Sequence, residues 1–176
     1  MERGKEFEES GLIFTFREEE VFTPEREDFY RGHKGLNTYG VSICDFICLR
    51  NAGEELLFIK VKSSAPRKPD EYVAAIRKKF RDSILVYVAA VANRHNTQAT
   101  NLPAPLKSLT ILTHPIRLVL IIRDIKREWL GPLRDSLRKE CGPISKIFSL
   151  DETQVYNQDL ASSKLGLRVR TISSPR

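Results

Sequence analysis

The segment Val41–Ser64, VSICDFICLRNAGEELLFIKVKSS, constrains the fold more than any other part of the chain. Its two halves, 41–50 and 56–62, are rich in β-branched and other apolar residues, which favours β-strands. Between them Asn51-Ala52-Gly53 is typical of a tight turn, because Asn and Gly tolerate a positive φ. The segment therefore predicts a β-hairpin around which the rest of the chain has to pack.

Charged side chains interrupt this apolar hairpin. Lys60 and Lys62 are two residues apart, so they share one face of the sheet, whereas Ile59 and Val61 lie on the other face. Asp45 lies among apolar residues in the first strand, where an unpaired carboxylate is costly. The simpler interpretation is an ion pair of Asp45 with Lys60 or Lys62 across the hairpin, worth up to about 1 kcal/mol. The alternative interpretation is a functional site.

The remaining elements are predicted from hydrophobic periodicity and turn residues. Residues 70–92 carry an apolar residue every three or four positions, which predicts a long helix. A second helix, 126–139, turns Trp129 inward and ends at Cys141-Gly142-Pro143. A short helix follows Thr23-Pro24, and extended segments or strands are predicted over 11–22, 106–113, 117–124, 144–150 and 165–172. This order predicts a single α/β domain over residues 1–176, with a mixed β-sheet flanked by helices.

Composition limits the class of protein. The hydrophobic fraction of 41% is ordinary for a globular domain, and no apolar run reaches the roughly 18 residues of a membrane span. The charged start of the chain lacks the apolar core of a secretory signal, so we expect a cytoplasmic protein with reduced cysteines. Cys44 and Cys48 are four residues apart on the predicted strand, so we expect them to share one face as small core residues.

The positive charge of the chain is unevenly distributed. The net charge is +6, yet residues 60–81 alone hold eight bases and two acids, and residues 164–176 hold four bases and no acid. Such a distribution is compatible with a polyanionic partner and equally with a solvated helix face.

The hairpin resembles the active-site hairpin of the PD-(D/E)XK nuclease superfamily. In that restriction-endonuclease-like family an Asp is followed, after a gap of roughly ten to thirty residues, by an acid-x-Lys triplet. Asp45 fits the first acid and Lys62 fits the lysine, but Lys60 stands where the second acid belongs. The order of elements agrees with the family over about residues 25–125, which leaves 126–172 as a C-terminal extension of helix and strand.

The resemblance implies a phosphodiesterase that uses Mg²⁺ or Mn²⁺. Asp45 and the backbone carbonyl of Val61 would be metal ligands, and Lys62 would orient the attacking water or stabilise the developing oxyanion. Because Lys60 repels a cation, three interpretations stay open. The missing acid has moved to Glu71, Glu25 or Glu27; the site is inactive and only binds nucleic acid; or Asp45 and Lys60 form a structural pair.

The predicted partner is DNA or RNA and not a membrane. The expected contacts to backbone phosphates are basic residues after the hairpin, namely Arg67, Lys68, Arg77, Lys78 and Arg81. The alternative function is a non-enzymatic interaction protein whose basic surface meets an acidic protein partner, and a homodimer also stays open.

Overall fold

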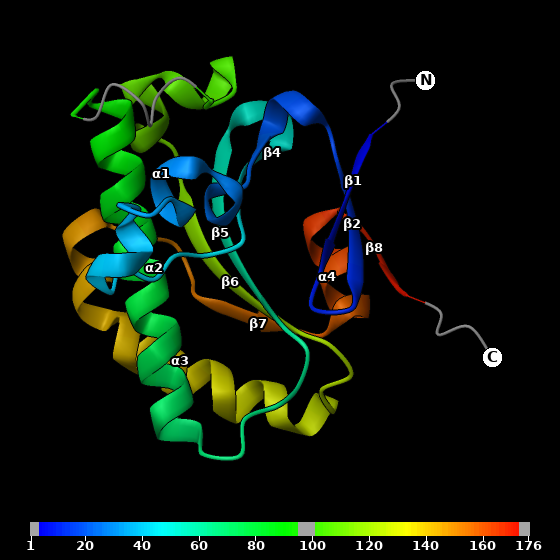
Figure 1. Ribbon diagram of the computed structural model, residues 1–176. Coiled ribbons are helices and arrows are strands. Elements are labelled where there is room, and N and C mark those ends of the chain that lie inside the picture. The colour runs from blue at the N-terminus through cyan, green and yellow to red at the C-terminus, as the bar shows by residue number, and fades with distance from the viewer. Residues whose placement is uncertain (1–3, 95–100, 173–176) are drawn as a thin grey trace.

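A computed structural model describes residues 4–94 and 101–172 of the chain. Its central feature is a five-stranded sheet in the order β3-β4-β5-β6-β7 (Figure 1). The strands β3, β4 and β5 are antiparallel, whereas β5, β6 and β7 are parallel, so the sheet is mixed. The strands are β3 (Val21–Phe22), β4 (Phe46–Arg50), β5 (Glu55–Lys62), β6 (Ile116–Ile122) and β7 (Gln154–Tyr156). The predicted α/β class is therefore confirmed.

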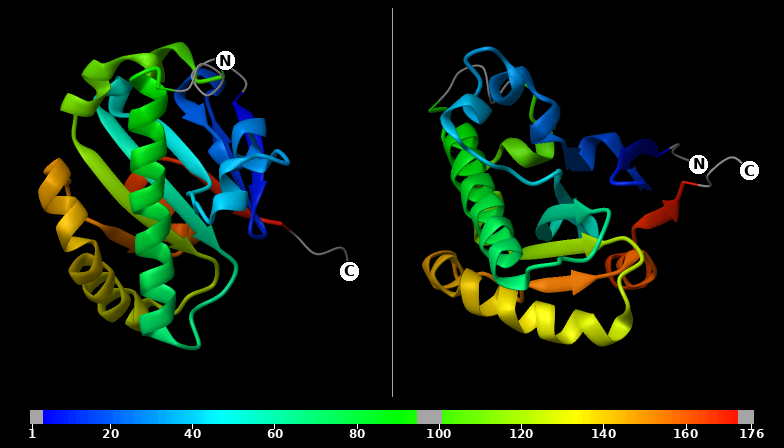
Figure 2. Two further views of the ribbon diagram at one scale, coloured as in Figure 1. Left: turned by 60° about the vertical axis from the view of Figure 1, so that its left-hand side comes forward. Right: turned by 60° about the horizontal axis from the view of Figure 1, so that its bottom comes forward.

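The two long helices, α2 (Pro69–Val91) and α3 (Arg127–Phe148), pack on one face of this sheet (Figure 2). Every third or fourth side chain of α2 is buried, including Val73, Ile76 and Phe80. These side chains meet alternate residues of β5 and β6, such as Phe58 and Leu118. The helix predicted from apolar periodicity over 70–92 is thus confirmed.

A second sheet, which the sequence did not predict, covers the opposite face. It has three antiparallel strands in the order β1-β2-β8, namely β1 (Lys5–Glu9), β2 (Leu12–Phe16) and β8 (Arg168–Thr171). The helix α4 (Gln158–Leu165) packs beside it. The aromatic rings of Phe14 and Phe16 each lie 5.1 Å from the ring of Phe46 on β4 and join the two sheets into one core.

The hairpin of β4 and β5 forms as predicted. Phe46 is paired with Ile59 and Arg50 with Glu55, and the turn places Ala52 and Gly53 at positive φ. Because β5 is a central strand, its alternating side chains are buried on both faces, with Leu57, Ile59 and Val61 towards the second sheet. Lys60 continues the other series, towards the helices.

The first predicted strand is too long, because β4 begins only at Phe46. The backbone N–H groups of Ser42 and Cys44 donate to Asp82 Oδ2 and Ser83 Oγ of α2, at 3.0 and 2.7 Å, instead of to a strand. The chain therefore bends before β4. As a result Cys44 packs on the helix side and Cys48 on the side of the second sheet, so the predicted shared face is wrong, although both thiols are free and buried.

The C-terminal half differs most from the prediction. The helix α3 does not end at Cys141-Gly142-Pro143 but continues to Phe148, because Leu137, Cys141 and Ile144 extend its buried stripe while Pro143 is exposed. The predicted strand 144–150 is consequently wrong, and Trp129 is 51% exposed instead of buried. The segment 106–113 lies in two 3-10 helices, Ala104–Lys107 and Leu109–Thr113.

Short helical turns connect β3 to the hairpin: Pro24–Arg26, α1 (Asp28–Arg31) and Leu36–Tyr39. Among the described residues, none of the helices combines the length and the apolar character that a membrane span requires.

Candidate functional site

Asp45 directly precedes β4 and lies opposite Lys60 of β5, since the Asp45 N–H donates to the Ile59 carbonyl at 3.0 Å. The helix α2 also holds the residues that precede Asp45. The N–H groups of Ser42 and Cys44 donate to Asp82 and Ser83 of this helix, as described above. In addition, Lys79 Nζ donates to the Ile43 carbonyl at 3.4 Å. The position of Asp45 is therefore set jointly by the sheet and by α2.

The carboxylate of Asp45 is buried, and each of its oxygens accepts a hydrogen bond. Lys60 Nζ donates to Oδ1 at 2.6 Å, and the Val61 N–H donates to Oδ2 at 2.6 Å. Asp45 and Lys60 are only 4% and 6% exposed. The structure thus brings together the two charges that the sequence placed opposite each other, in a nearly dry environment.

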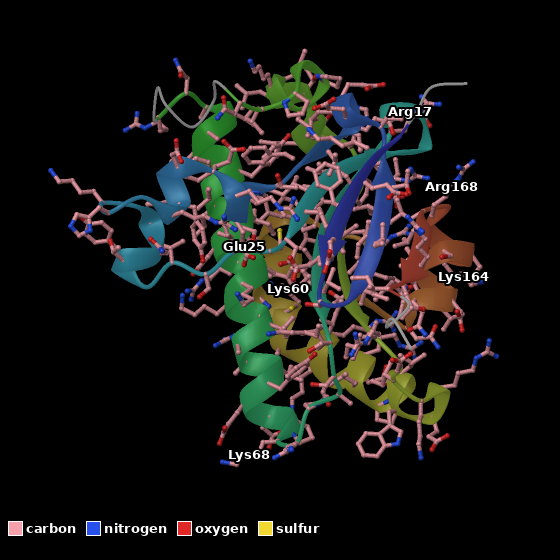
Figure 3. All side chains as sticks on the ribbon, turned by 45° about the vertical axis from the view of Figure 1, so that its right-hand side comes forward. Arg17, Glu25, Lys60, Lys68, Lys164 and Arg168 are labelled. Atoms are coloured by element: carbon pink, nitrogen blue, oxygen red, sulfur yellow. The ribbon has the colours of Figure 1, made fainter. Side chains whose placement is uncertain are left out.

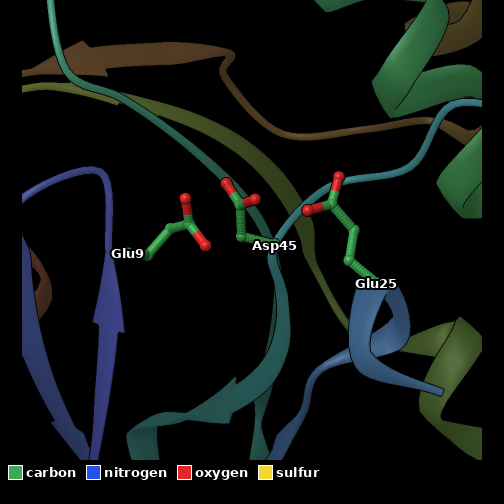
Figure 4. Close-up of side chains that lie close together, drawn as sticks. All are labelled: Glu9, Glu25 and Asp45. Atoms are coloured by element: carbon green, nitrogen blue, oxygen red, sulfur yellow. The ribbon is translucent and has the colours of Figure 1, made fainter.

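Two further carboxylates complete an acidic cluster. Glu9 comes from the end of β1 and Glu25 from the turn Pro24–Arg26. One carboxylate oxygen from each of Glu9, Glu25 and Asp45 lies within 4.8 Å of the other two. Figure 4 shows Asp45 between the other two. Glu25 Oε1 also lies 3.4 Å from Lys60 Nζ. The ammonium of Lys60 therefore contacts two of the three acids.

Three lysines counter these acids. Lys79 Nζ lies 3.7 Å from Glu25 Oε1, and Lys62 is half-buried on the same side of β5 as Lys60. Burial raises the pKa of Asp45, and the charge of Glu25 raises it further, against the effect of Lys60. Burial disfavours the Lys60 ammonium, but Asp45 and Glu25 outweigh burial and raise the pKa of Lys60.

The half-buried Lys62 responds in the opposite direction. Burial lowers the pKa of Lys62, and the neighbouring ammonium groups of Lys60 and Lys79 lower it further. Three acids and three lysines therefore interact in one cluster.

Carboxylate oxygens at this spacing are the ligands that a hard divalent cation prefers. However, the Lys60 ammonium already bonds to Asp45 and contacts Glu25, and it would repel a cation placed between them. With Lys60 in this position the cluster does not fit Mg²⁺ or Mn²⁺.

Of the acids predicted to replace the missing ligand, only Glu25 reaches the cluster. Glu71 pairs with Lys68 at 3.0 Å near the start of α2, and Figure 3 shows Lys68 far from Lys60 and Glu25. Glu27 instead accepts a hydrogen bond from Asn101 at 2.6 Å. The Val61 carbonyl, predicted as a metal ligand, faces the Ser10 hydroxyl at 3.5 Å.

The sequence did not indicate Glu9 or Lys79. Glu9 reaches the site because β1 and β2 form a hairpin whose tip, Ser10-Gly11, is adjacent to β5. The only local signal for that hairpin is the turn pair Ser10-Gly11, because Phe7 is the one apolar residue of the segment 5–9.

The predicted phosphate contacts on and before α2 are mostly paired with acids. Arg77 lies 3.7 Å from Glu140, while Lys78 and Arg81 both bind Asp82, at 2.6 and 2.8 Å. Burial opposes ionisation of Asp82, but its hydrogen bonds, led by that from Lys78, lower its pKa. These contacts involve three acids, Glu71, Asp82 and Glu140. The predicted bases, Arg67, Lys68, Arg77, Lys78 and Arg81, therefore outnumber the acids that they contact.

The chain matches no protein-family model, no curated protein and no solved structure.

Proposed function

We propose that the protein binds nucleic acid through a restriction-endonuclease-like core in which the Lys60 ammonium takes the place of the metal ion. The order β3-β4-β5-α2-β6, with an antiparallel hairpin, a helix and a parallel strand, is consistent with that core. Asp45 and Lys62 stand where the resemblance expects the first acid and the lysine.

One observation carries the proposal: Lys60 Nζ lies 2.6 Å from Asp45 Oδ1 and 3.4 Å from Glu25 Oε1. A cation at this point is what a two-acid metal site requires, and here the chain supplies it covalently. The ammonium is buried and bound to Asp45 by a direct hydrogen bond. Its removal would therefore leave a buried charge without its partner.

Binding to a polyanion is supported by the charges around the cluster. Lys62 and Lys79 belong to it, and the five bases from Arg67 to Arg81 outnumber their acidic partners. Contacts from such side chains to backbone phosphates release counterions, so the affinity should depend steeply on salt.

The test is fluorescence anisotropy with labelled single-stranded DNA, duplex DNA and RNA over a range of salt concentrations, in Mg²⁺ and in EDTA. We expect log K to fall linearly with log salt and to be unchanged by EDTA. Arg67→Gln should lower the affinity and reduce the salt slope by about 1.

Lys146→Gln on α3 removes the same charge from an exposed position and is the matched control. Absence of binding to all three nucleic acids at low salt would contradict the proposal. Weak salt dependence would favour the interaction protein with a protein partner.

A second candidate is a metal-dependent nuclease, which the three acids within 4.8 Å favour. It requires Lys60 to turn away from Asp45. Plasmid, single-stranded DNA and RNA are incubated with Mg²⁺ or Mn²⁺ and with the wild type, Asp45→Asn or Lys60→Glu. Cleavage by the wild type that Asp45→Asn abolishes supports this candidate, whereas cleavage by Lys60→Glu alone supports a nuclease core that lost its metal. Thermal unfolding of each variant checks that it is folded.

A further inference from the structure

A polar cavity lies away from the Asp45 cluster, where β2 and β4 end and β8 begins. Its volume is about 440 Å³, and its charged lining consists of Arg17, Arg50, Arg168 and Glu20. Figure 3 shows Arg17 and Arg168 on one side of the molecule, apart from Lys60 and Glu25. Three arginines, one directly after β2, one at the end of β4 and one at the start of β8, therefore line one concave surface.

The fold orients these arginines independently of one another. Arg168 begins β8 opposite Thr15, and Arg17 follows the last residue of β2. Arg50 ends β4, and its Nε and Nη2 donate to the carbonyls of Leu165 and Gly166 at 3.1 and 3.0 Å. Arg50 thus caps the C-terminus of α4, which fixes its guanidinium at the cavity wall.

Gly166 makes this close approach possible. Its φ is +60°, and a Cβ added there would lie 3.0 Å from Arg50 Nη2. A larger residue would therefore be strained and would press on the capping arginine.

Among the lining residues that the structure describes, the cavity has three arginines and one acid, Glu20. On the same strand as Arg168, Arg170 binds both carboxylate oxygens of Glu6 at 2.9 Å, and Lys5 of β1 binds Glu18. In the cavity, Glu20 reaches Arg17 at 3.5 Å. Within the part of the chain that the structure describes, Arg168 is exposed and forms no ion pair.

Like charges around a cavity repel one another, and an anionic ligand relieves that repulsion. Arginine presents its N–H donors in a planar fork that matches the oxygens of a phosphate group. We propose that this cavity binds a phosphate group, of a nucleic-acid backbone or of a free phosphate compound. Arg168 and Arg17 would contact the phosphate directly, and Arg50 would lie at the wall of the cavity.

The proposal does not depend on the Asp45 cluster, and its experiment uses Arg168→Gln with Arg170→Gln as the matched control. Both changes remove one arginine charge from β8, but Arg170 already has Glu6 as its partner. Binding of pyrophosphate is measured by calorimetry, and binding of a labelled single-stranded oligonucleotide by anisotropy, on the full chain.

We expect Arg168→Gln to weaken binding of the true ligand at least tenfold, and Arg170→Gln to change it less than twofold. Weaker pyrophosphate binding assigns a free phosphate compound, and weakening confined to the oligonucleotide assigns the nucleic-acid backbone. Equal affinities of the wild type and Arg168→Gln for both probes, or equal losses in both variants, would overturn the proposal. Thermal unfolding confirms that each variant is folded.

Discussion

The two ends of β5 each carry an acid–base pair, and the two pairs differ in their surroundings. At the start of the strand Glu55 binds Arg117 of β6 at 2.6 Å, and the Arg117 side chain is 29% exposed. At the other end Lys60 binds Asp45 at the same distance, and these side chains are 8% and 2% exposed. The two pairs therefore have the same donor–acceptor distance, but the pair at Lys60 is less accessible to water.

The second difference is the number of acids. The Lys60 end gathers the carboxylates of Glu9, Glu25 and Asp45, which repel one another in a partly dry region. Among the described residues, the ion pair at the start of β5 joins one acid, Glu55, to Arg117. The Lys60 end has two more carboxylates beside its ion pair, which is why we place the candidate functional site there.

Lys60→Met should have the largest effect. It leaves Asp45 buried beside two other acids without its cation, so the free energy of unfolding should fall by about 3–5 kcal/mol. Chemical denaturation of the variant and the wild type at pH 7 measures this difference.

Lys62→Met is the control on the same face of β5. Because the fold already disfavours the Lys62 ammonium, its removal should cost less than about 1 kcal/mol. Equal losses for the two variants would remove the distinction between Lys60 and its neighbour.

Arg117→Met should destabilise the protein less, by about 1–3 kcal/mol, the cost of leaving a buried acceptor such as Glu55 without this donor. The loss of stability is limited because water can reach the position of the Arg117 side chain and hydrogen-bond to Glu55. The same denaturation experiment checks the result, and a loss as large as that of Lys60→Met would show that the two ends of β5 are energetically alike.

The smallest expected effect is on pH dependence. Lys60 has a raised pKa in the folded state, so the native protein binds this proton more tightly than the unfolded chain does. The stabilisation is fully present below the unfolded pKa of about 10.4 and is lost as the pH rises through the folded value. Unfolding measured from pH 9 to 12 should show this loss above about pH 10.4 in the wild type, and the loss should be smaller in Lys60→Met.

Local patterns in the sequence predicted the elements that carry their own periodicity. The hairpin, α2 and β6 are of this kind, because an apolar run or a helical stripe is visible within one segment. The hairpin also left the pairing of Asp45 with Lys60 or Lys62 as one open interpretation, and the structure pairs it with Lys60.

The missed strands carry too few apolar residues to show a pattern of their own. The strand β1 has Phe7 as its one buried residue and forms because β2 pairs with it, and β7 is three residues long and adds to the edge of β6. The end of α3 was also decided by packing, because burial of Cys141 and Ile144 outweighs the local tendency of Gly142-Pro143 to end a helix.

The sequence by itself determined the buried hairpin, Lys60 and Lys62 as the possible partners of Asp45, and a basic chain with an α/β fold. Tertiary structure alone decided that Glu9, Glu25 and Lys79 join this pair and that three arginines surround a second cavity. These groups are far apart along the chain and carry no common local pattern. They meet because burial of apolar side chains on both faces of β5 brings the second sheet and α2 together at its end.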